Sequence, residues 1–132
     1  MSVTAEATRA IKKELKVLYP ELKFSVSMRD YSVVNVILKE GDIDFKQYKT
    51  KEGEIYYTDD KRDYFNVNDC HIDSHWKGLA RKIFKDILQI IYKHCGRHYD
   101  RNAGDMGADY AGWNYFIRVS VGSWCEPYVK KG

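Results

Sequence analysis

The four histidines are the residues of this 132-residue chain whose chemistry is easiest to recognise. They form two His-x-x-x-His pairs, each beside a cysteine: His71/His75 with Cys70, and His94/His98 with Cys95. Imidazole and thiolate are zinc ligands, and histidines four apart on a helix can share one metal. Both pairs, however, extend past the expected ends of a helix. No Glu follows His71, so the base of a His-Glu-x-x-His hydrolase is missing.

The two pairs also flank opposite ends of one expected helix, ~30 Å apart at ~1.5 Å per residue, so they cannot meet at one ion. We therefore expect no metal and no cofactor, and interpret the histidines as helix-end residues that interact with the dipole or with carbonyls. The three cysteines, Cys70, Cys95 and Cys125, are odd in number and irregularly spaced, which does not indicate a disulfide framework. A cysteine beside a histidine on a helix does not face it, so we predict no enzyme. A zinc- or thiol-dependent enzyme stays open as an alternative.

A third group of residues combines arginine, asparagine and aromatic side chains around the expected second helix and last strand. Arginine binds phosphates with two hydrogen bonds, and aromatic faces stack on bases. If these segments meet, they form a pocket for a nucleotide-like anion. The plainer alternative is that the aromatics fill the core and the arginines lie on the surface. The candidate ligand-binding residues are Tyr64, Phe65, Arg97, Arg101, Asn102, Trp113, Asn114 and Arg118.

Hydrophobic periodicity predicts the elements that position these residues. The sequence indicates a single α+β domain over residues 1–132, with two main helices packed on one face of an antiparallel sheet, in the order αββ(ββ)αβ. The expected helices are Thr4–Leu18 and Ser74–Cys95, and the expected strands are Lys23–Met28, Tyr31–Leu38, Trp113–Val121 and a short piece in Trp124–Val129. Weaker patterns favour strands at Glu54–Thr58 and Tyr64–Val67.

Helical spacing also predicts which faces are buried. Thr4 is the expected first N-cap, Asp73 or Ser74 the second, and Gly96 follows the second helix where a C-terminal glycine belongs. The expected buried stripes are Ala7, Ile11, Leu15 and Leu18 in the first helix, and Leu79, Ile83, Ile87 and Ile90 or Ile91 in the second, the latter widened by Trp76, Phe84 and Leu88.

The net charge of +3 is too small to identify a nucleic-acid binder. Lys77, Arg81 and Lys85 nevertheless stack on one side of the second helix, so a nucleic-acid-binding accessory domain stays open as an alternative. No signal peptide or membrane-length apolar run is visible, and we expect a cytoplasmic protein with no membrane partner.

Both ends of the chain resemble a known group of domains. Residues 11–27, Ile-Lys-Lys-Glu-Leu-Lys-Val-Leu-Tyr-Pro-Glu-Leu-Lys-Phe-Ser-Val-Ser, followed by the strand Val33–Leu38, resemble the opening of the large-polyvalent-protein-associated domains of bacteriophages and conjugative elements. Residues 115–128, Tyr-Phe-Ile-Arg-Val-Ser-Val-Gly-Ser-Trp-Cys-Glu-Pro-Tyr, are similar to the closing strand of that group. The matching motifs are structural and carry no catalytic residue.

The resemblance implies a small α+β domain that acts inside a host bacterial cell and counteracts its defence. Together with the absence of a catalytic motif, it predicts a non-enzymatic binder that sequesters or inhibits a host immune component. The expected partner is a small nucleotide-like ligand or a host defence protein. Small residues in the segment 103–108 allow close approach of a second subunit, so we expect a homo-oligomer.

Replacing Arg97 and Arg101 together by Ala is predicted to abolish activity and leave the fold intact, because exposed charges add little to stability. Circular dichroism and a binding assay on the double variant test this. A folded and fully active variant would place the binding site elsewhere.

Overall fold

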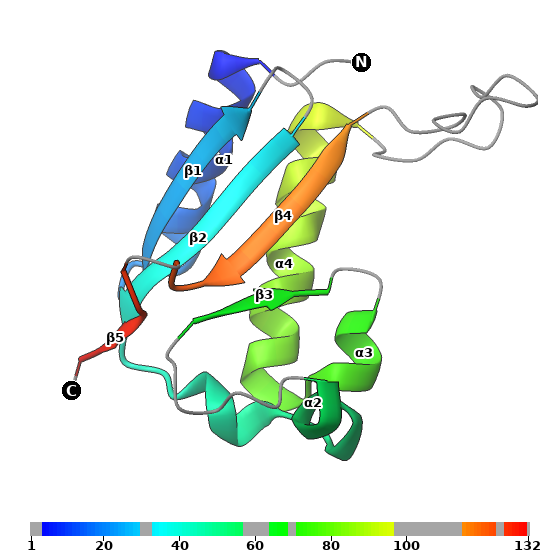
Figure 1. Cartoon of the computed structure of the whole chain (residues 1–132). Coiled ribbons are helices and arrows are strands. Elements are labelled where there is room, and N and C mark those ends of the chain that lie inside the picture. Colours follow the sequence, from blue (N-terminus) through cyan, green and yellow to red (C-terminus); the bar gives the residue numbers. More distant parts are fainter. Residues whose placement is uncertain are drawn as a thin grey trace, which may run out of the picture.

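The computed structural model describes residues 4–29, 33–56, 64–68, 71–96, 115–123 and 126–131. Two long helices, α1 and α4, lie behind a sheet, and the shorter helical segments gather at one end of it (Figure 1). The helical segments are α1 Ala5–Leu18, η1 Phe45–Tyr48, α2 Lys51–Tyr56, α3 Ile72–His75 and α4 Gly78–Cys95, and the strands are β1 Lys23–Arg29, β2 Val33–Gly41, β3 Phe65–Val67, β4 Phe116–Val121 and β5 Val129–Lys130. The expected α+β class with both long helices on one face is confirmed.

Helix α1 begins and ends as its sequence predicts. The side chain of Thr4 accepts a hydrogen bond of 3.1 Å from the Ala7 backbone N–H, which satisfies one of the free donors of the first turn. The buried stripe contains Ile11 and Leu15. Leu18, expected in that stripe, is instead 48% exposed. The core therefore covers the middle of the predicted apolar face fully, Ala7 in part and Leu18 least.

Strands β1 and β2 form the expected antiparallel hairpin, with Val26 opposite Val36 and Phe24 opposite Leu38. Alternating side chains of β2 (Val34, Val36 and Leu38) are buried against the helices, whereas the side chains between them point to the other face.

The prediction of a purely antiparallel sheet is wrong. The sheet is mixed, in the order β1-β2-β4-β3 with β5 beside β2, and β2 pairs in parallel with both β4 and β5. The physical reason is the crossover: a chain that leaves the end of β2 and returns along α4 starts β4 level with the beginning of β2. Tyr31 and Trp113, where two strands were expected to start, lie outside the described residues.

The predicted strand at Glu54–Thr58 is also wrong. Residues 51–56 form the short helix α2, and Thr58 lies outside the described residues. The hydroxyl of Thr50 accepts a hydrogen bond from the Gly53 N–H, and Gly53 packs so closely on the His75 carbonyl that a Cβ would lie 2.2 Å from it. This contact explains why α2 forms beside α3. The weaker strand at Tyr64–Val67 is confirmed as β3.

The second predicted helix, Ser74–Cys95, is interrupted after only its first two residues. Trp76 is extended (φ −126°, ψ 153°) and forms a β-bridge with Lys49, so the helix from Ser74 divides into α3 and α4. Gly78 then adopts φ +59°, which favours glycine, and a Cβ there would lie 3.0 Å from the Tyr48 ring. The predicted caps Asp73 and Ser74 therefore do not cap α4, whose N-cap is Lys77. The expected Gly96 end is confirmed, at φ 77°.

Helix α4 supplies more buried core residues than any other described element. Its buried side chains, Ala80, Ile83, Phe84, Ile87, Leu88, Ile91 and Cys95, meet a fully buried Trp76, which lies edge-on to Phe84 at 4.9 Å between ring centroids. Leu79, in the first turn of α4, was expected in this stripe but is 39% exposed, whereas Ile83, Ile87 and Ile91 are buried as predicted.

Replacing Ile83 by Ala is predicted to cost about 2–5 kcal/mol of unfolding free energy, because it leaves a cavity at a fully buried position. Leu79→Ala is the matched control and should change stability by less than about 1 kcal/mol. Urea unfolding followed by circular dichroism measures both. Equal losses in the two variants would contradict the assignment of the buried face.

Candidate ligand-binding site

Three of the eight predicted binding residues belong to the described part of the chain. Tyr64 precedes β3, Phe65 begins β3, and Arg118 lies in the middle of β4. The other five, Arg97, Arg101, Asn102, Trp113 and Asn114, lie outside the described residues, and their placement stays a prediction. The site is therefore built from the sheet that carries Arg118.

The sheet has one face toward the helices and one face away from them, and Arg118 is on the second. Val119 and Val121 of β4 are buried with the helices, so the alternating residues Phe116, Arg118 and Ser120 point the other way. Both long helices lie behind the sheet in Figure 1, and none of the labelled helices covers its front. We call this front surface, formed by the outward residues of β1–β4, the outer sheet face.

Polar side chains cross the outer sheet face in two rows. In the first row Ser27 of β1, Asn35 of β2 and Arg118 of β4 are register partners. The second row is Ser25, Ile37, Ser120 and Asn66, on β1, β2, β4 and β3 respectively. Partners in register present side chains to the same face about 5 Å apart, so Arg118 and Asn35 are direct neighbours.

Arg118 and Asn35 have unused hydrogen-bonding capacity. Arg118 is exposed and makes no ion pair with any residue that the structure describes. The Oδ1 atom of Asn35 is buried and accepts no hydrogen bond within the described ranges. A buried acceptor without a donor costs free energy, so a ligand that donates to Asn35 and offers an anion to Arg118 would satisfy both.

Aromatic residues border these rows. Phe116, two positions before Arg118, is 41% exposed on the same face. Tyr64 is half-buried beside the other end of the face, where its hydroxyl accepts a hydrogen bond of 3.5 Å from the Asn66 amide. The outer sheet face therefore combines a guanidinium, a free amide oxygen and two aromatic rings. The sequence prediction included Tyr64 and Arg118 but not Asn35, whose signal was its polar position in the otherwise apolar strand 33–38.

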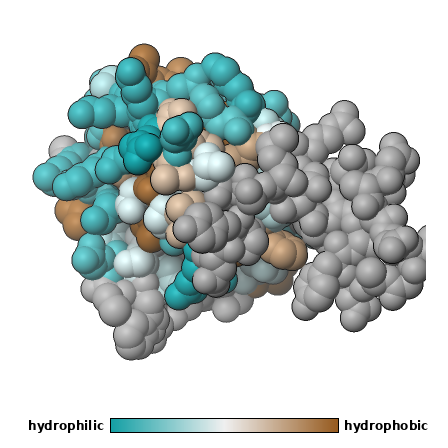
Figure 2. All heavy atoms as spheres, turned by 90° about the horizontal axis from the view of Figure 1, so that it is seen from above, coloured by the Kyte–Doolittle hydropathy of each residue, from teal (hydrophilic) through white to brown (hydrophobic). Residues whose placement is uncertain are grey.

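The beginning of β4 is fixed to the end of α4 at one edge of this face. The hydroxyl of Tyr115, which is 1% exposed, donates a hydrogen bond of 2.5 Å to the Gly96 carbonyl. Burial raises the pKa of Tyr115 far above its ordinary range, so the hydroxyl remains a donor. Seen from above, the described atoms at this end of the molecule are mostly hydrophilic, with small separate hydrophobic areas (Figure 2). The described part of this end favours a polar ligand.

The comparison with protein families identifies the chain. A family model described as large polyvalent protein associated domain 29 matches residues 2–120. The chain belongs to this family. The sequence resemblance is thereby confirmed, and the protein is a domain of the kind associated with the polyvalent proteins of phages and mobile elements. Neither the curated proteins nor the solved structures yielded a match.

In this large polyvalent protein associated domain, His71 and His75 lie before the start of α4, and His94 lies in its last turn. His71 and His75 stack at 5.4 Å between ring centroids, and Tyr56 stacks on His75 at 4.5 Å. His94 contacts the Glu14 carboxylate through its Nε2 at 3.1 Å, while His98 lies outside the described residues. Among the residues that the structure describes, no three His, Cys, Asp or Glu side chains come together as a metal site would require.

The one described cysteine of the domain is not exposed for chemistry. Cys95 is 2% exposed at the end of α4, and burial raises the pKa of its thiol. A raised pKa keeps the thiol protonated and unreactive at neutral pH. Cys70 and Cys125 lie outside the described residues.

The basic row on α4 is partly neutralised in the folded domain. The carboxylate of Asp73 lies 3.0 Å from Lys85 Nζ and 3.6 Å from Arg81 Nε, and Lys85 lowers the pKa of Asp73. Of the predicted phosphate-binding row, only Lys77 makes no ion pair with another described residue. None of the described helices is long and apolar enough to cross a membrane.

Unfolding of the domain should become easier as the pH falls below the ordinary histidine pKa. Burial is the main cause that lowers the pKa of His75 from 6.5, and the neighbouring His71 adds to it. Below 6.5 the unfolded chain binds a proton that folded His75 does not, so stability is present above that pH and is lost as the pH falls toward the folded pKa.

The melting temperature of the native protein should therefore drop by a few degrees between about pH 7.5 and about pH 5.5. His75→Gln should remove most of that slope, and His71→Gln, at an exposed position, should keep most of it. A slope unaffected by His75→Gln would show that another group controls it.

Proposed function

We propose that the protein is a non-enzymatic counter-defence protein of a phage or mobile element, which binds and sequesters a nucleotide-derived immune signal of the host. Membership of a family of mobile-element domains supports the biological setting. The observation that carries the choice of ligand is the pairing of Arg118 with the unsatisfied Asn35 amide oxygen on the outer sheet face.

A nucleotide offers hydrogen-bonding partners for both Arg118 and Asn35. Its phosphate accepts the charge-assisted hydrogen bonds of the Arg118 guanidinium. A ribose hydroxyl or an exocyclic amino group donates to Asn35 Oδ1, and the base stacks on an exposed ring such as Phe116. Arg118 already stands exposed on a rigid sheet, which reduces the entropy lost on binding, whereas the Asn35 amide must turn outward to present its buried Oδ1.

A host defence protein is the other expected partner for this face. Its requirements differ, because protein interfaces bury roughly 800 Å² on each side, with apolar anchors at the centre. The centre of the outer sheet face is mostly polar, with Ile37 among Asn35, Arg118, Ser120 and Ser27. This polarity favours the small charged ligand.

The test is thermal unfolding of the whole chain with cyclic dinucleotides and with ADP-ribose-type nucleotides. A ligand at 100 times its Kd stabilises the native state by about 2.7 kcal/mol and should raise the melting temperature by several degrees. Arg118→Ala should lose that shift. Arg9→Ala, an exposed arginine on α1, is the matched control and should retain it.

Two results would count against the proposal. Absence of a shift with every nucleotide class would rule out a nucleotide signal as the ligand. A full shift in Arg118→Ala would show that nucleotides bind away from the outer sheet face.

A further inference from the structure

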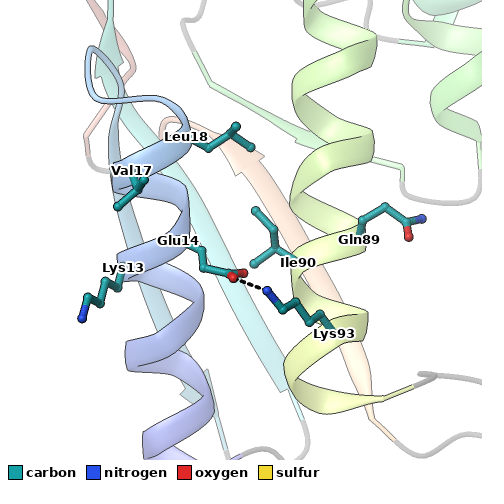
Figure 3. Close-up of a pocket in the computed structure, with 7 residues that line it drawn as sticks. All are labelled: Lys13, Glu14, Val17, Leu18, Gln89, Ile90 and Lys93. Atoms are coloured by element: carbon teal, nitrogen blue, oxygen red, sulfur yellow. Dashed lines mark hydrogen bonds and ion pairs between the residues drawn. The ribbon is translucent and has the colours of Figure 1, made fainter.

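The helical side of the molecule, opposite the outer sheet face, has a groove of its own. It runs between α1 and α4, has a volume of about 570 Å³, and is lined by Lys13, Glu14, Val17, Leu18, Gln89, Ile90 and Lys93. We call it the α1–α4 groove. In Figure 3, Leu18 and Ile90 point into the space between the helices, and Lys13 and Gln89 point away along its two flanks.

Polar contacts hold the two walls of the α1–α4 groove at a fixed spacing. At one end Glu14 accepts from Lys93 at 2.5 Å and meets His94 at 3.1 Å. At the other end Tyr19 donates to Asp86 at 2.5 Å. Since residue 14 lies opposite 93 and residue 19 opposite 86, the helices run antiparallel with both ends bridged. The groove is therefore preformed.

The floor of the groove exposes apolar surface that the core does not use. On α1, Val17 is 77% exposed and Leu18 is 48% exposed, and Ile90 on the facing helix α4 is only partly buried (Figure 3). Scattered apolar residues on a surface need no explanation, but these three lie together in a concave site. Apolar side chains in a groove gain free energy from an apolar occupant and gain nothing from a phosphate backbone, so protein is the occupant that fits.

Charge decides which protein fits. Together α1 and α4 carry eight basic side chains against three acidic ones, although the net charge of the chain is only +3. The excess lies on the helical layer, where Lys13 and Lys93 border the groove itself. A second copy of this chain would bring the same positive surface against it, which is unfavourable. An acidic partner is attracted.

We propose that the α1–α4 groove binds an acidic amphipathic helix of a partner protein. Apolar side chains of that helix, spaced three and four residues apart, would contact Val17, Leu18 and Ile90, as helices do in hydrophobic grooves. Its flanking glutamates and aspartates would meet Lys13, while Lys93 keeps its contact with Glu14. The partner helix would thus lie on the face opposite the nucleotide, so both could bind at once.

A synthetic peptide of roughly 18 residues tests the proposal, with leucines on one helical face and glutamates beside them. Fluorescence anisotropy with the whole chain at about 0.15 M salt, where charges act over only ~8 Å, gives the Kd. We expect binding to this peptide. A peptide of the same composition with shuffled leucines, and one with lysine in place of glutamate, should bind at least about tenfold more weakly.

Variants of the chain locate the binding. Val17→Asp should weaken it about tenfold or more, whereas Ile55→Asp, at a position on α2 that is 75% exposed, should not. Lys13→Glu should weaken it several-fold, whereas Lys12→Glu, the same charge change on the same helix outside the groove, should not. Arg118→Ala should leave peptide binding intact, which separates this proposal from nucleotide binding.

Other occupants give different results, and each would overturn the proposal. Peptide binding that is equal in Val17→Asp, or equal for the shuffled peptide, would exclude a helix in the groove. Self-association in sedimentation that Val17→Asp abolishes would identify a second copy as the occupant. Binding to phosphatidylcholine–phosphatidylserine vesicles that Val17→Asp abolishes, without peptide binding, would identify an anionic membrane surface.

Discussion

The parallel pairing of β2 with β4 is the constraint on which the rest of this structure depends. Parallel neighbours cannot be joined by a tight turn, so the chain must cross from one end of the sheet to the other between them. Helix α4 makes that crossing, and its apolar stripe buries the inner face of the strands that it connects. Helices α1 and α4 both lie on that side of the sheet. One face of the molecule is therefore a sheet surface that carries Arg118, and the other is a helical surface that contains the α1–α4 groove.

The sequence predicted those parts of the fold that depend on residues close together in the chain. Thr4 caps α1, Gly96 ends α4, and β1 pairs with β2, because each depends on residues a few positions apart. The sheet direction could not be predicted that way, since the β2–β4 pairing joins segments about eighty residues apart. The break at Trp76 was also hidden, because it depends on a bridge to Lys49 and on the Tyr48 ring against Gly78.

The sequence indicated which types of side chain could form a binding site, but not where the fold would place them. Arginine with aromatic residues near the last strand predicted Arg118 and Tyr64, which the folded chain places on one sheet face. Asn35 was not predicted because its role depends on tertiary structure: its amide oxygen is buried beside Arg118 and has no donor among the described residues. Leu18 and Leu79 were assigned to the core by helical spacing, yet both are exposed, since spacing does not say where a neighbouring element ends. One of them, Leu18, thereby became part of the α1–α4 groove.

Because Cys95 is buried, the reactivity of its thiol can report local unfolding at the end of α4. A thiol that is 2% exposed and held protonated reacts with an alkylating reagent only when the last turn of α4 separates from the sheet. The rate of thiol modification under native conditions thus measures how often the end of α4 unfolds locally. No label has to be introduced. The hydrogen bond from Tyr115 to the Gly96 carbonyl joins β4 to the end of α4 at the same corner, so its loss should speed the modification of the thiol.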